Sequence, residues 1–384
     1  MRIAYVTPFD ARNLTAQNNW SGTGYYIAQS IQSQSIPIDY IGPLQNRFPL
    51  QVLSKCKSRY YSFSRKNYIK YVDPLILRNY ARQISEKLDD IESDVVFSAA
   101  SDSIAYLDCD QPIAFWADAT FANLIDFYPV YSNLCKESFY NAHLVQSTSL
   151  EKSKLAIYSS DWAAQTAIDY YNADPEKVKV VPFGANVESN KSFDEIKALI
   201  ESRPIDQCKL LFLGVDWLRK GGDVALEVAK QLNRSGLNTE LTLIGCQPID
   251  QEPLPSYIKP LGFINKSTPE GKAILYQLIA DSHFLILPSI ADCTPIVFCE
   301  ANAFGVPCIS RKIGGIPTMI RDNLNGKLFD QDADSNEYCE YIYNIFTNYA
   351  RYKELALSAF NEYESRLNWR VSGKRIKELL LSIA

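Results

Sequence analysis

The chain has 384 residues, of which 47% are hydrophobic and 22% charged, and its formal net charge is −5. This length favours two domains, no segment reaches the ~20 apolar residues of a membrane span, and the acidic balance argues against a nucleic-acid-coating protein. Nine scattered cysteines and two histidines suggest neither a disulfide framework nor a metal site. The first residues read as a strand rather than a secretory signal, so we expect a cytoplasmic protein.

Short β-branched or aromatic segments alternate with segments of helical period, and the pattern occurs twice. This alternation predicts an α/β fold with parallel sheets. In the first half we expect helices that open near Tyr25 and Trp162, and strands at 3–7, 94–98, 113–116, 144–147, 155–158 and 178–181. In the second half we expect helices at 223–232 and 300–304, and strands at 209–213, 240–244, 284–288 and 307–310. The charged segment 189–207 is the predicted linker.

The strongest functional signal lies in residues 288–307, where a strand ends, a loop carries Asp292, and a new helix carries Glu300. The free amides of Ile296 and Val297, with the positive end of the helix dipole, are suited to a diphosphate. Glu300 is then placed to bind a ribose diol and Asp292 to face a sugar. The alternative is that both acids are only carboxylates favoured near a helix start.

A second signal lies in residues 212–223, where Gly214 follows a strand and Arg219 and Lys220 precede a helix. Glycine lets the backbone approach a ligand closely, and the two cations are suited to neutralise a departing diphosphate. The alternative is a solvated turn.

A third signal is the short glycine loop of residues 20–25, which contains Gly22 and Gly24 and opens a helix. A dinucleotide fingerprint requires a third glycine where this chain has Ile27, which disfavours an NAD enzyme. The position of the loop is suited to contact with the donor phosphates or with the acceptor.

Together these segments resemble the family-4 glycosyltransferases, the large retaining group with the GT-B fold. That family has two acids separated by seven residues where Asp292 and Glu300 stand, and a G-x5-K-G pattern where Gly214 and Lys220 stand. The resemblance implies two Rossmann-like domains whose sheets face each other across a central cleft. It assigns 1–188 to the acceptor side, 206–365 to the nucleotide-sugar donor, and 366–384 to a helix that crosses back to the first domain.

The resemblance also implies donor contacts from Phe263 near the nucleobase, and from the loop and helix residues Thr294, Pro295, Ile296 and Val297. This chain departs from the family at Asp292, which replaces Glu, and at Pro295, which removes one N–H donor where Gly is frequent. Val215 stands where Arg is frequent, and Arg219 is the candidate substitute.

Asp118 stands where many members of the family have His. It is a candidate to orient acceptor or sugar hydroxyls and to assist proton removal. The alternative is that it caps a helix beginning at Ala119.

The implied activity is retaining transfer of a hexosyl group, without metal or cofactor, from a nucleotide-diphosphate sugar to a glycan, lipid-linked or small-molecule acceptor. Two alternatives stay open. One is a GT-B sugar-nucleotide epimerase, and the other is a non-catalytic nucleotide-sugar-binding subunit, suggested by Asp292 and Val215. His143 and His283 are interpreted as structural.

The segment 45–82 is basic and rich in tyrosine. Asp73 is its only acid, against nine cations: Arg47, Lys55, Lys57, Arg59, Arg65, Lys66, Lys70, Arg78 and Arg82. Because cations attract anionic headgroups and tyrosines favour interfaces, the segment predicts either peripheral contact with the inner membrane face or an anionic acceptor. A solvated helix face is the alternative.

Overall fold

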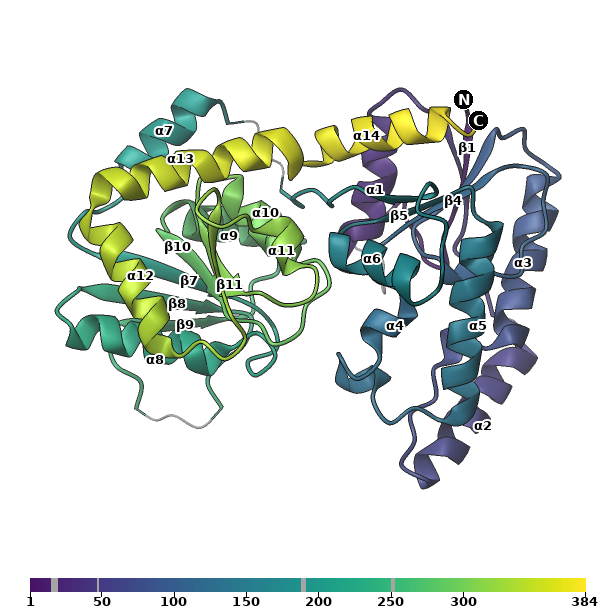
Figure 1. Ribbon diagram of the computed structural model, residues 1–384, viewed down its shortest axis with the longest axis horizontal. Coiled ribbons are helices and arrows are strands. Elements are labelled where there is room, and N and C mark those ends of the chain that lie inside the picture. Colours follow the sequence, from purple (N-terminus) through teal and green to yellow (C-terminus); the bar gives the residue numbers. More distant parts are fainter. Residues whose placement is uncertain (15–19, 47, 188–190, 250–252) are drawn as a thin grey trace. The chain divides into compact units, whose positions relative to one another are not determined.

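The computed structural model describes residues 1–14, 20–46, 48–187, 191–249 and 253–384, and the chain divides into two compact units (Figure 1). The first unit is Met1–Pro182 with Trp369–Ala384, and the second is Phe183–Asn368. The last helix, α14 (Trp369–Leu381), packs against α1 (Thr23–Gln32) of the first unit. The units therefore change at 182/183 and 368/369, whereas the sequence suggested 188 and 366.

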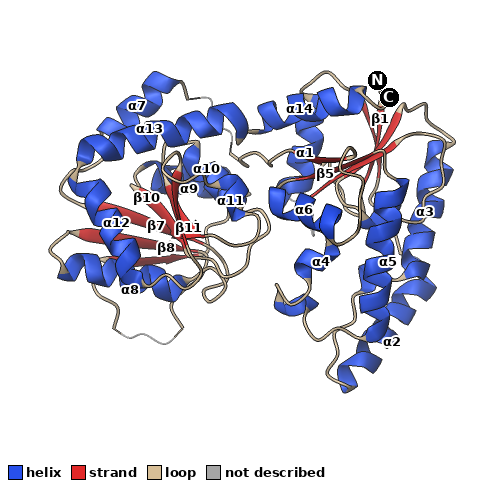
Figure 2. Ribbon diagram, in the orientation of Figure 1, coloured by secondary structure: helices blue, strands red, loops and turns tan. Residues whose placement is uncertain are grey.

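The first unit is built on a six-stranded parallel sheet of order β2-β1-β3-β4-β5-β6. Figure 2 shows its strands in red, with helices around them in blue. Its strands are β1 (Ile3–Val6), β2 (Ile38–Ile41), β3 (Val95–Ser98), β4 (Ile113–Ala117), β5 (Leu155–Tyr158) and β6 (Val178–Val180). Its other α-helices are α2 (Phe48–Phe63), α3 (Pro74–Leu88), α4 (Phe121–Leu124), α5 (Lys136–Lys152) and α6 (Asp161–Asp169). Every residue of β1, β3, β4 and β5 is buried, as expected for parallel strands covered on both faces.

The strand predicted at 144–147 is wrong, because these residues lie inside α5. A short apolar run does not distinguish a strand from a buried helix. The buried positions Ala142, Val145 and Ser149 recur at helical spacing, so they form the face of α5 that is turned toward the rest of the first unit.

The second unit repeats the plan with a six-stranded parallel sheet of order β12-β11-β10-β7-β8-β9. Its strands are β7 (Cys208–Leu213), β8 (Thr239–Ile244), β9 (Ile258–Gly262), β10 (Phe284–Leu287), β11 (Cys308–Arg311) and β12 (Gly326–Phe329). Its helices are α7 (Phe193–Glu201), α8 (Gly222–Arg234), α9 (Pro269–Ala280), α10 (Ile296–Asn302), α11 (Ile316–Met319), α12 (Ser335–Thr347) and α13 (Tyr349–Arg366). The core lies on β7 and β10, where Phe212 and Phe284 are fully buried.

The predicted linker is largely a folded part of the second unit. Its residues 189 and 190 lie outside the described residues, but α7 follows, with Ile196 and Ile200 buried beside α13 (Figure 1). Arg203 is only 4% exposed and donates hydrogen bonds to the carbonyls of residues 280, 304 and 305 and to the hydroxyl of Tyr352. The charged, exposed face of an amphipathic helix resembled a linker in sequence.

The α/β fold with two Rossmann-like units is thus confirmed. Among the described residues, no helix is long and apolar enough to cross a bilayer.

Candidate functional site

Two loops meet at the carboxyl edge of the second sheet. Strands β7 and β10 are parallel neighbours, so the loops that follow them, 214–221 and 288–295, leave the sheet side by side. The amide of Ile290 donates to the carbonyl of Arg219 at 2.9 Å. This edge is where ligands bind in open α/β sheets.

Asp292 is the centre of a charged cluster between these loops. Its side chain contacts the Lys220 ammonium, and the Arg219 guanidinium lies 3.6 Å from the same carboxylate oxygen. Arg219 also donates to the carbonyl of Ala291 at 3.0 Å. Asp292 is 7% exposed, so water screens these charges weakly. We call Arg219, Lys220 and Asp292 the Asp292 cluster.

Two glycines make the cluster sterically possible. A Cβ atom on Gly214 would lie 2.9 Å from Cγ of Lys220, so the missing side chain leaves room for the lysine to fold across the loop. Gly221 has a left-handed φ of +75°, and a Cβ there would lie 2.1 Å from the carbonyl oxygen of Pro288. Glycine is therefore required where the two loops touch.

Glu300 lies in α10, behind the Asp292 loop, and is 4% exposed. Burial raises the pKa of its carboxyl, and the nearby Lys266 ammonium, 3.7 Å away, opposes that increase. Lys266 belongs to the loop after β9, which also carries Phe263, whose side chain is 74% exposed. An exposed aromatic ring and a buried carboxyl are thus supplied by elements at the same sheet edge.

The amides predicted to hold a diphosphate lie at the start of α10. Pro295 is the N-cap residue, Ile296 and Val297 form the first turn, and all three follow the half-buried Thr294. Within the described part of the chain, neither the Ile296 nor the Val297 amide has a protein acceptor. Both donors are available to a ligand.

Three predicted site residues lie in the first unit. Gly22 precedes α1 with a left-handed φ of 91°, and the carbonyl of Gly24 accepts a hydrogen bond from the Tyr5 hydroxyl at 3.0 Å. Asp118 directly follows β4 and is half-buried. The helix after it begins at Phe121 and is capped by Thr120, so the alternative that Asp118 caps this helix is wrong.

Two site residues were missed by sequence reasoning. Lys266 pairs with Glu300, and the amide of Gly315 donates to the carbonyl of Asp292 at 3.2 Å. Lys266 carried a usable signal, since a cation in a loop after a strand is a candidate at this edge. Gly315 carried none beyond its glycine-rich context.

Both histidines have structural surroundings. His283 is fully buried, its Nδ1 accepts from the Lys209 amide at 3.0 Å, and burial lowers its pKa to about 3. His143 lies in α5 with its Nδ1 2.9 Å from the Tyr171 hydroxyl. Neither residue belongs to the Asp292 cluster.

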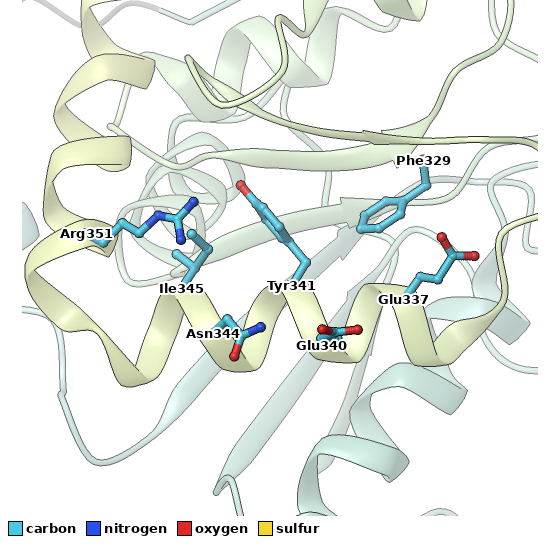
Figure 3. Close-up of a pocket in the computed structure, with 7 residues that line it drawn as sticks. All are labelled: Phe329, Glu337, Glu340, Tyr341, Asn344, Ile345 and Arg351. Carbon is cyan, nitrogen blue, oxygen red and sulfur yellow. The ribbon is translucent and has the colours of Figure 1, made fainter.

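A pocket elsewhere in the second unit lies along α12, with Tyr341 and Arg351 among its lining residues (Figure 3). The Tyr341 hydroxyl is buried and has no hydrogen-bond partner among the described residues. None of the predicted site residues lines this pocket.

Solved glycosyltransferases share the fold of this chain. Sucrose-phosphate synthase from Thermosynechococcus elongatus superposes with a TM-score of 0.67 at 14% identity, covering 100% of this chain and 98% of that one. Anabaena HepE in complex with UDP superposes with a TM-score of 0.65 at 16% identity, covering 100% of both chains. The GT-B fold expected from the sequence is therefore confirmed.

Curated relatives match part of the chain. The D-inositol 3-phosphate glycosyltransferase of Acidothermus cellulolyticus is 26% identical over 187 residues, covering 45% of this chain and 42% of that protein. The enzyme of the same name from Thermobifida fusca is 28% identical over 230 residues, covering 56% and 52%. The chain thus spans about half the length of the curated relatives it matches. Residues 177–364, which contain the Asp292 cluster and Glu300, match the family Glycosyl transferases group 1.

Proposed function

We propose that this protein transfers a hexosyl group from a nucleotide-diphosphate sugar to a glycan, lipid-linked or small-molecule acceptor, with retention of anomeric configuration and without a metal. The observation that carries the proposal is the Asp292 cluster, which gathers two cations and one carboxylate at a sheet edge within the family match. HepE, which shares the fold, binds UDP.

The donor diphosphate occupies the position between the Asp292 cluster and the start of α10. Lys220 and Arg219 exchange part of their contact with Asp292 for the phosphate oxygens, and the amides of Ile296 and Val297 donate from the other side. Because the site is largely buried, these donors stabilise the charge that develops on the departing diphosphate more strongly than water would.

Glu300 binds the ribose diol of the donor. Its carboxyl group is buried, with the Lys266 ammonium 3.7 Å away, and two hydroxyls can pair with it there. Phe263, Gly22 and Gly24 keep their proposed roles as donor contacts, with Phe263 near the base.

In the transfer step, the bond between the anomeric carbon and the phosphate oxygen breaks, and the acceptor oxygen bonds to the same face of that carbon. The departing phosphate takes the acceptor proton, so no protein nucleophile is required. Asp292 accepts a hydrogen bond from a hydroxyl of the transferred sugar, and Asp118 orients an acceptor hydroxyl.

The first experiment tests donor binding and turnover. Thermal-shift measurements with UDP-, GDP-, ADP- and CDP-sugars identify the donor, because a ligand that binds only the folded state raises Tm. Lys220→Met weakens binding by roughly 10- to 100-fold, the loss of one charge-assisted hydrogen bond, whereas the exposed control Lys197→Met does not.

The same protein is then incubated with its donor in the presence and absence of acceptors. Product that forms only with an acceptor supports transfer. An epimerised donor formed without acceptor, or binding without turnover across a broad acceptor panel, refutes the transferase proposal.

The helix α2 suits contact with an anionic membrane surface. Phe48, Tyr60 and Phe63 are 78%, 70% and 80% exposed, and none of the described side chains of α2 is buried. Lys55 and Arg59 add positive charge on the same helix. We propose that α2 brings the enzyme to the inner membrane face through these side chains.

Polar contacts attach α2 to its unit. The Lys57 ammonium lies 2.7 Å from a carboxylate oxygen of Asp73 and 2.5 Å from one of Glu137. Glu137 belongs to α5, which lies beside α2 (Figure 1), and the Tyr61 hydroxyl donates to its carboxylate at 2.8 Å. Lys57 is therefore used internally, and Arg47 lies outside the described residues. The other seven cations of the segment that lie in the described residues are exposed, so it keeps most of the positive charge that its composition suggested.

Vesicle sedimentation tests this contact. Binding to vesicles that contain phosphatidylglycerol, but not to pure phosphatidylcholine, is expected, and Lys55→Glu/Arg59→Glu should abolish it. The control Lys87→Glu/Lys374→Glu changes the same charge on exposed sites outside α2. Equal loss in both variants would show that only net charge matters and would contradict a role for α2.

A further inference from the structure

A shallow pocket in the first unit is lined by aromatic and polar side chains from α4, the loop after it and α6. Its aromatic and polar lining residues are Asn123, Asp126, Phe127, Trp162, Thr166 and Tyr170, and the aliphatic Ala122 and Ile125 complete the lining. We propose that this pocket binds a neutral pyranose unit of the acceptor. That the bound sugar is part of an acceptor rests on the proposed transferase function, whereas the binding of a sugar to this pocket does not.

Aromatic rings form one side of the pocket. The rings of Phe127 and Trp162 lie 5.0 Å apart at 43°, and Tyr170, with 57% of its surface exposed, lines the same pocket. A pyranose ring has one face of C–H groups, and these groups pack on the electron-rich face of an aromatic ring. Half-buried rings beside an exposed one, all lining the same pocket, offer such an apolar surface to a ligand.

The floor of the pocket is polar and fixed. Asn123 is 7% exposed and donates to the Thr166 hydroxyl at 2.7 Å, and that hydroxyl donates to the Trp162 carbonyl at 2.9 Å. The side-chain oxygen Oδ1 of Asn123 accepts hydrogen bonds from the backbone amide and the hydroxyl of Thr120. These bonds hold the floor in one conformation before a ligand arrives, which lowers the entropic cost of binding.

Asp126 supplies the hydrogen-bond acceptor that a sugar requires. It adopts a left-handed φ of 55°, a conformation that Asp tolerates better than most residues. Its side chain is exposed and, in the part of the chain that the structure describes, makes no hydrogen bond or ion pair. An ionised carboxylate with two free oxygens can accept from two neighbouring hydroxyls.

The charge of the pocket selects a neutral ligand. Asp126 is its only charged lining residue, and no Lys or Arg lines it in the described structure. A phosphate or an anionic lipid headgroup would meet a carboxylate without a compensating cation. Hydroxyl donors meet no such repulsion.

The pocket also lies where an acceptor unit is expected. Helices α4 and α6 are neighbours, and they follow β4 and β5 at the carboxyl edge of the first sheet (Figure 1). Asp118, proposed to orient an acceptor hydroxyl, belongs to the same connection between β4 and α4. Sugar units next to the reacting hydroxyl would be held by Trp162, Phe127 and Asp126.

Saturation-transfer NMR on the full chain tests the proposal, with methyl α-glucoside, methyl α-mannoside and methyl β-galactoside as probes. We expect saturation of ring C–H protons for at least one probe. Asp126→Ala and Tyr170→Ala alter exposed side chains, and each should weaken that binding by about 5-fold or more. Tyr140→Ala removes another exposed tyrosine, from α5 and outside the pocket, and should leave glycoside binding unchanged.

Absence of saturation with all three glycosides overturns the proposal, as does binding that both pocket variants retain. Binding of the wild type to anionic vesicles that is lost in Tyr170→Ala also overturns it, in favour of a lipid surface. Donor binding and donor turnover are measured in parallel. Intact donor turnover without glycoside binding refutes only the pocket, and glycoside binding without donor binding refutes only the proposed transferase function.

Discussion

The pairing of Asp292 with Lys220 and Arg219 leads to an unusual expectation for the Asp292→Asn variant. A diphosphate must compete with the carboxylate for the two cations. The neutral amide has nearly the same shape but binds a cation far more weakly. The variant should therefore bind a nucleoside diphosphate more tightly than the wild type while it transfers sugar more slowly.

The magnitude follows from the environment of the pair. A hydrogen bond to a charged group contributes about 1.5–3 kcal/mol, and Asp292, at 7% exposure, is poorly screened by solvent. Only part of this energy becomes available for diphosphate binding in the variant, because the asparagine amide oxygen still accepts a hydrogen bond from the cations. We expect a gain of about 1–2 kcal/mol, or roughly 5- to 30-fold in Kd. The transfer rate should fall by about 100-fold, the usual effect of losing one group that is directed at the transition state.

Isothermal titration calorimetry of UDP and GDP against the wild type, Asp292→Asn and Asp292→Asn/Lys220→Met measures the effect. The gain should be much smaller in the double variant, because Lys220, the cation in direct contact with Asp292, is then missing while Arg219 remains. Equal or weaker diphosphate binding by the single variant, with an unchanged Tm, would show that Asp292 does not restrain the cations.

Three further expectations follow from described contacts. Arg203→Ala leaves three carbonyls and the Tyr352 hydroxyl without their buried donor, so urea unfolding should show a loss of about 3 kcal/mol or more, while the exposed Arg234→Ala changes stability by less than about 1 kcal/mol. Gly214→Ala adds a Cβ atom 2.9 Å from Cγ of Lys220. Because that lysine stem is flexible, Tm should be nearly unchanged while diphosphate affinity falls about 10-fold, and unchanged affinity would contradict the role of Gly214. Glu300 has a pKa raised by burial, so the folded state holds its proton more tightly than the unfolded state, and stability decreases as pH rises from the ordinary glutamate pKa through the raised one. Glu300→Gln should therefore raise Tm at neutral pH but not below about pH 4, and an equal shift at both pH values would refute this assignment.

Much of the fold could be predicted from local patterns. Strands such as β4 and β10 are continuous apolar segments because both faces of a central parallel strand are covered. The edge strands β2, β9 and β12 were not predicted, since much of each faces away from the core and their sequences lack that continuity.

The candidate site was likewise predictable only in part. The sequence alone singled out Gly214, Lys220, Asp292 and Glu300 as candidates, because they follow strands at spacings that resemble a known family and because backbone geometry after a strand depends on neighbouring residues. Only the tertiary structure decided that Lys220 contacts Asp292, 72 positions away, and that Lys266 reaches Glu300. Such contacts depend on which strands are neighbours in the sheet, and the order that places β10 beside β7 results from packing of the whole unit rather than from any local segment.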